Sequence, residues 1–214
     1  MTSTKPTVHL YTLSQLVYAL PGSWERKIKK IEEGRERAYG CYQPVREAIA
    51  SFCAANGSGR ERIVARMMKQ AQEAPRGRGQ NPERDNMRAF KVFEEKCYSK
   101  IGSFVRSLIR RPQGLGVSFE SVLLRGAPHL EVTDKDGESF YVFVSAAKWP
   151  EQDLKAYLEL LSIVVQSEFD ASPSSIWHMD LRRGGVSKYR PSMRVKKRCA
   201  DAAQHYARIF GGTK

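Results

Sequence analysis

The sequence predicts an α/β protein of the α+β type, in which a mixed sheet is flanked by helices and follows a helical N-terminal region. Three observations lead to this fold class. Residues 1–80 show helical apolar spacing, residues 117–146 alternate with a period of two, and residues 151–210 return to helical spacing around one further strand. With 214 residues, 41% of them hydrophobic, the chain can bury a full core. We expect a helical N-terminal region over 1–80 and a core over 84–214.

Three segments of the N-terminal region have helical periodicity: SQLVYAL, PVREAIASFCAA and GRERIVARMMKQAQEA. The second ends at Asn56-Gly57, where Gly57 is expected to terminate the helix because glycine adopts left-handed backbone angles readily. The stretches WERKIKKIEEGRER and GSGRERIVARMMK mix both charge signs, and we expect them to form ordinary solvated faces. Residues 74–83 carry two prolines and two glycines and are expected to form a loop.

A long helix is expected from Pro82 to Arg111, where Pro112 would end it. Its apolar residues recur at spacings of three and four, which places them on one stripe: Phe90, Phe93, Cys97, Ile101, Phe104 and Leu108. Three strands follow, in the segments VSFESVLL, PHLEVTD and SFYVFVSA. Asp136-Gly137 between the last two segments predicts a tight hairpin.

After Trp149-Pro150, an amphipathic helix along EQDLKAYLELLSIVVQSEF is expected to cross over to another strand, SSIWHMDL. On that strand we expect His178 to be a hydrogen-bonded structural residue. RRGGV then predicts a turn, and PSMRVKKRCADAAQHYARIF predicts a closing helix. The inner face of this closing helix is expected to consist of Val195, Cys199, Ala202, Tyr206, Ile209 and Phe210.

The balance of charges indicates the class of partner. The chain has 36 Lys and Arg residues against 23 Asp and Glu residues, a formal charge of +13. A surplus this large attracts phosphate polymers. No apolar run approaches the ~20 residues needed to cross a bilayer, so no membrane partner is expected. The N-terminus lacks the pattern of a signal peptide, and we expect a cytoplasmic protein.

The four cysteines are expected to be buried structural thiols. Cys41, Cys53, Cys97 and Cys199 lie far apart, without a CxxC pair or a CxH partner. This spacing favours neither a zinc site nor a disulfide framework.

The segment GAPHLEVTDKDGESFYVFVSAAKW, residues 126–149, combines a glycine, a hairpin and a lysine beside a tryptophan. Together with the order of elements from about 84 to 211, it resembles the PD-(D/E)XK nuclease superfamily, and most of all its RecB-like exonuclease branch. The resemblance implies a restriction-endonuclease-like core with a cleft that accepts a duplex or a single strand. In that family two acids on adjacent strands bind a metal ion, a lysine follows the second acid, and a helix with Gln and Tyr comes next.

Placed on this sequence, the family's glycine is Gly126 and its lysine is Lys148, but its two acids fall at His129 and Ala146. Phosphodiester hydrolysis in this family uses Mg²⁺ or Mn²⁺, and these hard cations need carboxylate oxygens. Loss of one such acid should slow the reaction on the order of a thousandfold or more. The resemblance therefore implies a catalytically inactive nuclease-like protein, a pseudoenzyme without a cofactor, in which Lys148 keeps a phosphate-binding role.

Further contacts to nucleic acid are expected around Lys148. Gln152 and Tyr157 match the family's helix, one residue further apart than the family pattern. The segment WHMDLRRGG is like the strand and basic turn that follow in such nucleases. Residues 182–198 form the densest basic stretch, with no acid among its charges: Arg182, Arg183, Lys188, Arg190, Arg194, Lys196, Lys197 and Arg198. Its glycine turn lets the backbone approach phosphate, and Tyr189 could stack on a base.

The leading hypothesis is an inactive nuclease-like protein that binds DNA or RNA, or docks in a nucleoprotein complex, through a basic face. Two alternatives remain open. Glu131 lies two residues after His129, so both side chains leave the same strand face, and with Lys148 they could form a rearranged site for Mg²⁺ or Mn²⁺. The protein would then be an active nuclease. The second alternative is a protein-interaction subunit that uses the fold as a scaffold and its helical N-terminal region as the contact surface.

Overall fold

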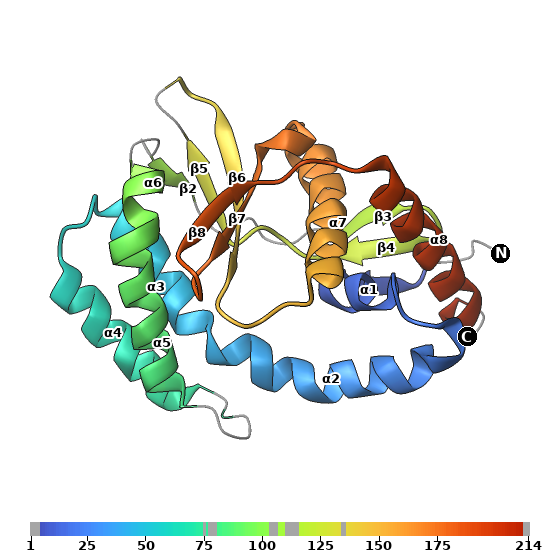
Figure 1. Cartoon of the computed structure of the whole chain (residues 1–214), viewed down its shortest axis with the longest axis horizontal. Helices are drawn as coiled ribbons and strands as arrows, with labels where there is room; N and C mark the ends of the chain where they lie inside the picture. The colour runs from blue at the N-terminus through green and yellow to red at the C-terminus, as the bar shows by residue number, and fades with distance from the viewer. Residues whose placement is uncertain are drawn as a thin grey trace.

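The computed structural model describes residues 5–74, 76, 81–102, 107–109, 116–133 and 136–211. Their fold is a mixed α/β arrangement in which a five-stranded sheet lies between two groups of helices (Figure 1). The predicted α+β class is therefore confirmed. Within these residues, no helix is both long enough and apolar enough to span a bilayer.

The five-stranded sheet contains the predicted hairpin and the predicted crossover. Its strands follow the order β2 (Ser107–Ile109), β5 (Leu130–Thr133), β6 (Ser139–Ser145), β7 (Ile176–Asp180) and β8 (Gly185–Lys188). β5 and β6 pair antiparallel around the turn at Asp136-Gly137, as predicted. β6 and β7 pair in parallel, and α7 (Glu151–Phe169) connects them across one face of the sheet.

The segment VSFESVLL, predicted as one strand of this sheet, forms a hairpin in a second sheet. Strands β3 (Gly116–Phe119) and β4 (Val122–Arg125) pair antiparallel, and β4 pairs in parallel with β1 (Thr7–His9). Glu120 has a φ of 49° and turns the chain between β3 and β4. The prediction of one continuous strand was wrong because alternation reports a buried face and not the partner that covers it.

The long helix predicted from Pro82 to Arg111 is shorter than expected. It consists of α5 (Pro82–Val92), a π-helical turn (Phe93–Cys97) and α6 (Tyr98–Gly102), and the stripe residues Phe90, Phe93, Cys97 and Ile101 are all buried as predicted. Leu108 was expected on the same helix, but it lies in β2. Phe104 and Arg111 lie outside the described residues.

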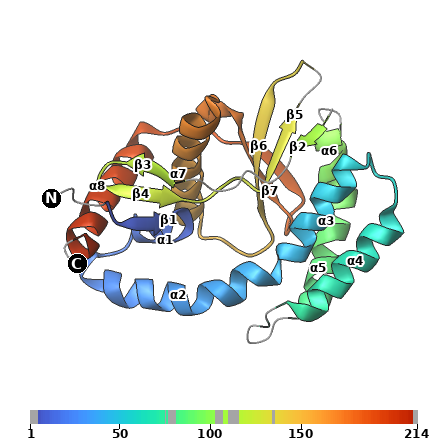
Figure 2. The same cartoon turned by 180° about the vertical axis from the view of Figure 1, so that it is seen from behind.

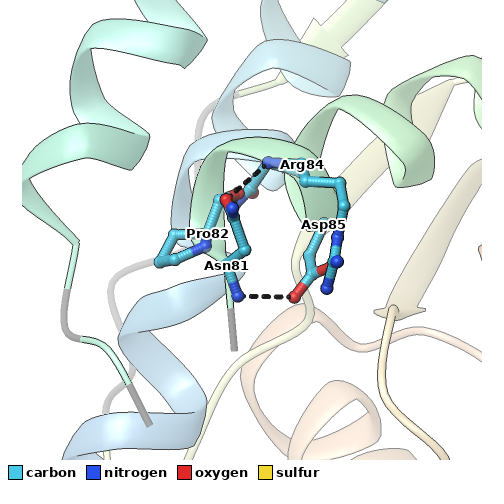
Figure 3. Close-up of polar contacts among 5 residues, drawn as sticks. Asn81, Pro82, Arg84 and Asp85 are labelled. Atoms are coloured by element: carbon cyan, nitrogen blue, oxygen red, sulfur yellow. Dashed lines mark hydrogen bonds and ion pairs between the residues drawn. The ribbon is translucent and has the colours of Figure 1, made fainter. Parts of the chain in front are cut away.

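A short hydrogen-bond network fixes the start of α5 (Figure 3). The Asn81 side chain accepts a hydrogen bond from the Arg84 backbone N–H at 3.1 Å, and the Asn81 backbone N–H donates to the Asp85 carboxylate at 3.2 Å. Pro82 occupies the first helical turn, where its missing N–H costs nothing. The helix therefore begins at a side-chain cap. Residues 75 and 77–80 of the loop predicted over 74–83 lie outside the described residues.

The N-terminal region is helical, as predicted. It contains α1 (Leu10–Leu16), the short 3₁₀ turn Pro21–Ser23, α2 (Trp24–Cys41), α3 (Gln43–Ala54) and α4 (Arg60–Glu73). Gly57 follows α3 with a φ of 79°, and its N–H donates to the Phe52 carbonyl at 2.9 Å, which is a glycine-assisted helix end. Figure 2 shows α2 running from the side of α1 and of the closing helix α8 (Met193–Phe210) to α3 on the other side.

Two hydrophobic clusters cover opposite faces of the five-stranded sheet. The first joins α1, α7, α8 and the small sheet, and includes Leu10, Leu13, Phe143, Leu160 and Cys199. The second joins α3, α4 and α5, and includes Phe52, Phe90, Phe93, Val144 and Met179. Residues from the first 80 positions contribute to both clusters, and the domain boundary between 80 and 84 stays a prediction.

The four cysteines are free and buried, as predicted. Burial raises the pKa of Cys53 and of Cys199 to about 12, and that of Cys97 to about 11. Because the thiolate is the reactive form, we expect no labelling of the native protein by a maleimide near neutral pH, and labelling of all four thiols in denaturant. Mass spectrometry of labelled protein checks this. Rapid labelling of any thiol in the native state would contradict it.

Candidate functional site

A histidine with a structural role stands where the nuclease family has its first acid. His129 precedes β5 and is 7% exposed. The ring Nδ1 of His129 accepts a hydrogen bond from the Val144 backbone N–H at 2.9 Å, and the backbone N–H of His129 donates to the Val142 carbonyl at 2.9 Å. Since Nδ1 is an acceptor, the neutral ring carries its proton on Nε2, and neither nitrogen presents a lone pair to a metal ion. His129 therefore extends the ladder between β5 and β6.

Glu131 lies on the same face of β5 and contacts a tyrosine. It stands opposite Tyr141 in the strand register, and the Tyr141 hydroxyl donates to Glu131 Oε1 at 3.4 Å. Burial, followed by the charge of Glu131, raises the pKa of Tyr141 to about 12. Among the described side chains, no group of three or more His, Cys, Asp and Glu residues is placed to hold a metal ion. The structure thus does not bring Glu131 and His129 together with a further ligand.

A pocket of about 100 Å³ lies at the end of β6, where the family's second acid and its lysine would stand. Ala146 and Lys148 both line it, and Tyr157 reaches it from α7. Gln152 is exposed and does not line it. The remaining lining residues are Tyr11, Gln15, Tyr42, Arg46, Phe143, Ala147, Trp149 and Pro150. Among the described residues of this lining, the charged groups are Arg46 and Lys148, and none is a carboxylate.

The positive charges of two more arginines, Arg182 and Arg88, affect the pKa of Tyr42 in the pocket lining. Burial, followed by the charge of Asp85, raises the pKa of Tyr42, while Arg182 and Arg88 act in the opposite direction. Both arginines are exposed. Arg182 belongs to the turn after β7, which begins opposite the end of β6 because Asp180 pairs with Ser145. Cations from α3, α5 and the segments after β6 and β7 therefore surround one end of the sheet.

The basic stretch 182–198 is exposed but does not form one patch. All eight of its cations are exposed, as expected. β8 separates Arg182 and Arg183 from Arg190 by about 14 Å of extended chain, and α8 starts beyond Arg190. Lys188 lies over the rings of Phe140 and Trp177, and Arg198 lies over the ring of Tyr18, 5.0 Å from its centre. None of these cations is among the described residues that line the pocket beside Lys148, but the charge of Arg182 acts on Tyr42 of that lining.

Tyr189 is not placed to stack on a base, in contrast to the expectation from sequence. It is 8% exposed, and its hydroxyl donates to the buried carboxylate of Glu159 on α7. Burial, followed by the hydrogen bond to Glu159, raises the pKa of Tyr189. The same Glu159 oxygen accepts the Ser192 N–H at 3.0 Å. Tyr189 directly follows β8, and its ring is directed into the fold, so it anchors the connection between β8 and α8 to Glu159.

His178 is hydrogen-bonded inside the fold, as expected for a structural histidine. Its Nε2 lies 2.8 Å from the Ser145 hydroxyl, and Ser145 is 3% exposed. Burial lowers the pKa of His178, and Asp180 acts in the opposite direction. The hydrogen bond joins the end of β6 to the middle of β7, and neither residue lines the pocket.

Sequence reasoning missed several residues of the pocket. Tyr11, Gln15, Tyr42 and Arg46 come from the N-terminal helices, and the pattern of those helices gave no sign that they meet β6. A second pocket of about 690 Å³ shares Tyr11 and Gln15 with the first. It is lined further by Ser23, Arg26, Lys27, Lys30 and Ile31. The helix WERKIKKIEEGRER, expected to be an ordinary solvated face, thus places cations beside the Lys148 pocket.

No protein-family model matches the chain, and a search of curated proteins found no match.

Proposed function

We propose that the chain binds nucleic acid through its phosphates at the end of the five-stranded sheet, without hydrolysing it. One observation carries the proposal: Lys148 and Arg46 come from two separate segments to one pocket whose described lining residues include no carboxylate, and the charge of Arg182 acts on Tyr42 of the same lining. Phosphate oxygens are the expected partner of such a group, since arginine can bind them with two donors and lysine as a point charge. The formal charge of +13 favours the same partner.

The absence of hydrolysis in this proposal rests on the two positions that carry acids in the family resembled. Ala146 offers no ligand atom, and the Nδ1 of His129 is occupied by the Val144 N–H. Hard divalent cations need several oxygen ligands to activate water. The pocket can therefore hold a phosphate by its cations while lacking the groups that would cleave it.

Fluorescence anisotropy with a labelled single strand tests the proposal across salt concentration. Binding by phosphate contacts should weaken by on the order of 10- to 100-fold between about 50 and 200 mM salt, because counterions are released. Lys148→Ala should weaken binding about fivefold and lower the salt slope by about 1, uniformly across sequences. Lys69→Ala, which removes an equally exposed lysine from α4 at the outer edge of the molecule (Figure 1), should change neither.

Three results would contradict this proposal. Affinity that does not depend on salt, or an equal effect of Lys148→Ala and Lys69→Ala, would remove the phosphate site at this pocket. Cleavage of the strand in Mn²⁺ that disappears with chelator and in Glu131→Ala would instead favour an active nuclease.

A further inference from the structure

The pocket beside Lys148 is lined mainly by aromatic rings, which phosphate contacts alone do not explain. Tyr11 packs edge-on against Trp149 with 5.3 Å between ring centres, and Trp149 packs edge-on against Tyr157 at 5.2 Å. Phe143 contacts Trp149 and Tyr157 from below at 5.4 and 4.4 Å. In an edge-on pair the edge of one ring covers one face of the other ring, so each ring keeps at least one face that its partner does not cover, and a planar aromatic ligand can stack on such a face.

Two of the aromatic rings that line the pocket are almost fully buried, and three are only partly covered. Phe143 and Tyr157 are 2% and 3% exposed and form the floor of the pocket. Tyr11, Tyr42 and Trp149 are half-buried and form its walls. Burial raises the pKa of Tyr11 and of Tyr42, so both hydroxyls keep their protons near neutral pH and add no negative charge to the pocket.

The size of the pocket limits the ligand. A volume of about 100 Å³, at 10–15 Å³ for each water-sized sphere, holds roughly seven to ten atoms. A single pyrimidine ring with its substituents fits this space, whereas a base pair does not.

The charges around the pocket indicate what the aromatic ligand is attached to. Arg46 and Lys148 lie in the same lining as the rings; Nε and Nη1 of Arg46 are buried, whereas Lys148 is exposed, so a ligand bound there meets the charge of Lys148 directly. Beyond Tyr11, the adjoining pocket adds Arg26, Lys27 and Lys30 from α2. Lys27 is held there by a hydrogen bond from its Nζ to the Gln15 carbonyl at 2.5 Å. Its positive charge lowers the pKa of the partly buried Asp153, whose own charge affects the pKa of Tyr11. A planar ring next to a row of cations is complementary to a nucleobase on a phosphate backbone.

We infer that this pocket receives one unstacked nucleobase of a single strand, whose neighbouring phosphates lie along Lys148 and along Lys27 of α2. The inference rests on the proposed phosphate binding and adds the form of nucleic acid that is bound. Bases within a duplex are stacked and paired, so they do not present a free face to a pocket of this kind. Stacking on an aromatic side chain does not depend on base identity, and binding should show little sequence preference.

The test compares three labelled ligands on the full chain by anisotropy at one salt concentration. They are an oligothymidylate, a strand of equal length and charge in which every base has been replaced by an abasic unit, and a duplex of the same length. We expect the oligothymidylate to bind about 5- to 100-fold more tightly than the abasic strand, the range that stacking of one base gives. The duplex should not bind more tightly than the abasic strand.

Trp149→Ala identifies the pocket as the place of stacking. It should bring the affinity for oligothymidylate down to that for the abasic strand, whose own affinity should stay within about twofold. Tyr18→Ala is the matched control, because Tyr18 is a half-buried aromatic residue outside the pocket and should leave the ratio of the two affinities unchanged. The comparison of ligands on the unmodified protein does not depend on whether either variant folds.

The outcomes separate this inference from the proposed function. Equal affinities for the oligothymidylate and the abasic strand, or tightest binding of the duplex, would overturn the single-base pocket and leave phosphate binding intact. No binding of any ligand would overturn both. Tighter binding of the oligothymidylate that Trp149→Ala leaves unchanged would move the stacking elsewhere and overturn the inference.

Discussion

Replacement of Asn86 by alanine is expected to lower the free energy of unfolding by about 4 kcal/mol, because three buried partners lose their hydrogen bonds. Asn86 is completely buried on α5. Its Oδ1 accepts the Val45 N–H at 2.9 Å, and its Nδ2 donates to the carbonyls of Cys41 and Pro82 at 2.6 and 2.7 Å. Val45 lies in the first turn of α3, where backbone N–H groups have no partner inside the helix.

Thermal and urea unfolding measure this effect. For a chain of this size, a loss of 4 kcal/mol corresponds to a decrease in Tm of roughly 10 °C. Asn86→Asp keeps the acceptor for Val45 but loses both donors, so it should not restore stability. Lys91→Ala changes an exposed residue of the same helix and should stay within about 0.5 kcal/mol of the unmodified protein. A loss below about 1 kcal/mol in Asn86→Ala would show that the junction of α2, α3 and α5 does not depend on these bonds.

Elements with local signals were predicted correctly. The stripe of Phe90, Phe93 and Cys97, the Asp136-Gly137 hairpin and the crossover helix after Pro150 each depend on neighbours within about 20 residues, and the structure has all of them. Among the stripe residues that the structure describes, Leu108 is the one that does not lie on the helix. It belongs to a strand paired with β5, and a spacing of seven from Ile101 matched the helical period by coincidence.

Partners far apart in the chain were not predictable from patterns. β1 pairs with β4 across more than 110 residues, and nothing in the alternation of VSFESVLL indicates that partner. The Lys148 pocket was missed for the same reason, since Tyr11 and Arg46 reach β6 only through the packing of α1 and α3. Tyr189 shows the opposite error: a tyrosine among cations was expected to face a ligand, but Glu159 holds it inside the fold.

The loss of Glu159 should also be strongly destabilising. Glu159 is 2% exposed on α7 and accepts hydrogen bonds from the Tyr189 hydroxyl and the Ser192 N–H. Glu159→Ala leaves the buried Tyr189 hydroxyl and the half-buried Ser192 N–H without this acceptor, at about 1–3 kcal/mol for a fully buried donor, and is expected to lower the free energy of unfolding by about 3 kcal/mol. Glu159→Gln keeps an amide oxygen that can accept from both donors and should cost less than about 1 kcal/mol. Gln166→Ala, an exposed change on the same helix, is the control for helix propensity.

Glu159→Ala also shows which end of the basic stretch 182–198 binds phosphate. Tyr189 and Ser192 flank Arg190 and lead into the cations of α8, whereas Arg182 and Lys148 lie at the opposite end of β8. If phosphates are bound at the Lys148 pocket, Glu159→Ala should keep its affinity for a single strand within about threefold when measured well below its Tm, because loosening α8 does not move the pocket. A loss of affinity as large as that in Lys148→Ala would assign the binding to the α8 end instead. Urea unfolding and anisotropy on one preparation therefore give both the stability that Glu159 supplies and the location of the phosphate contacts.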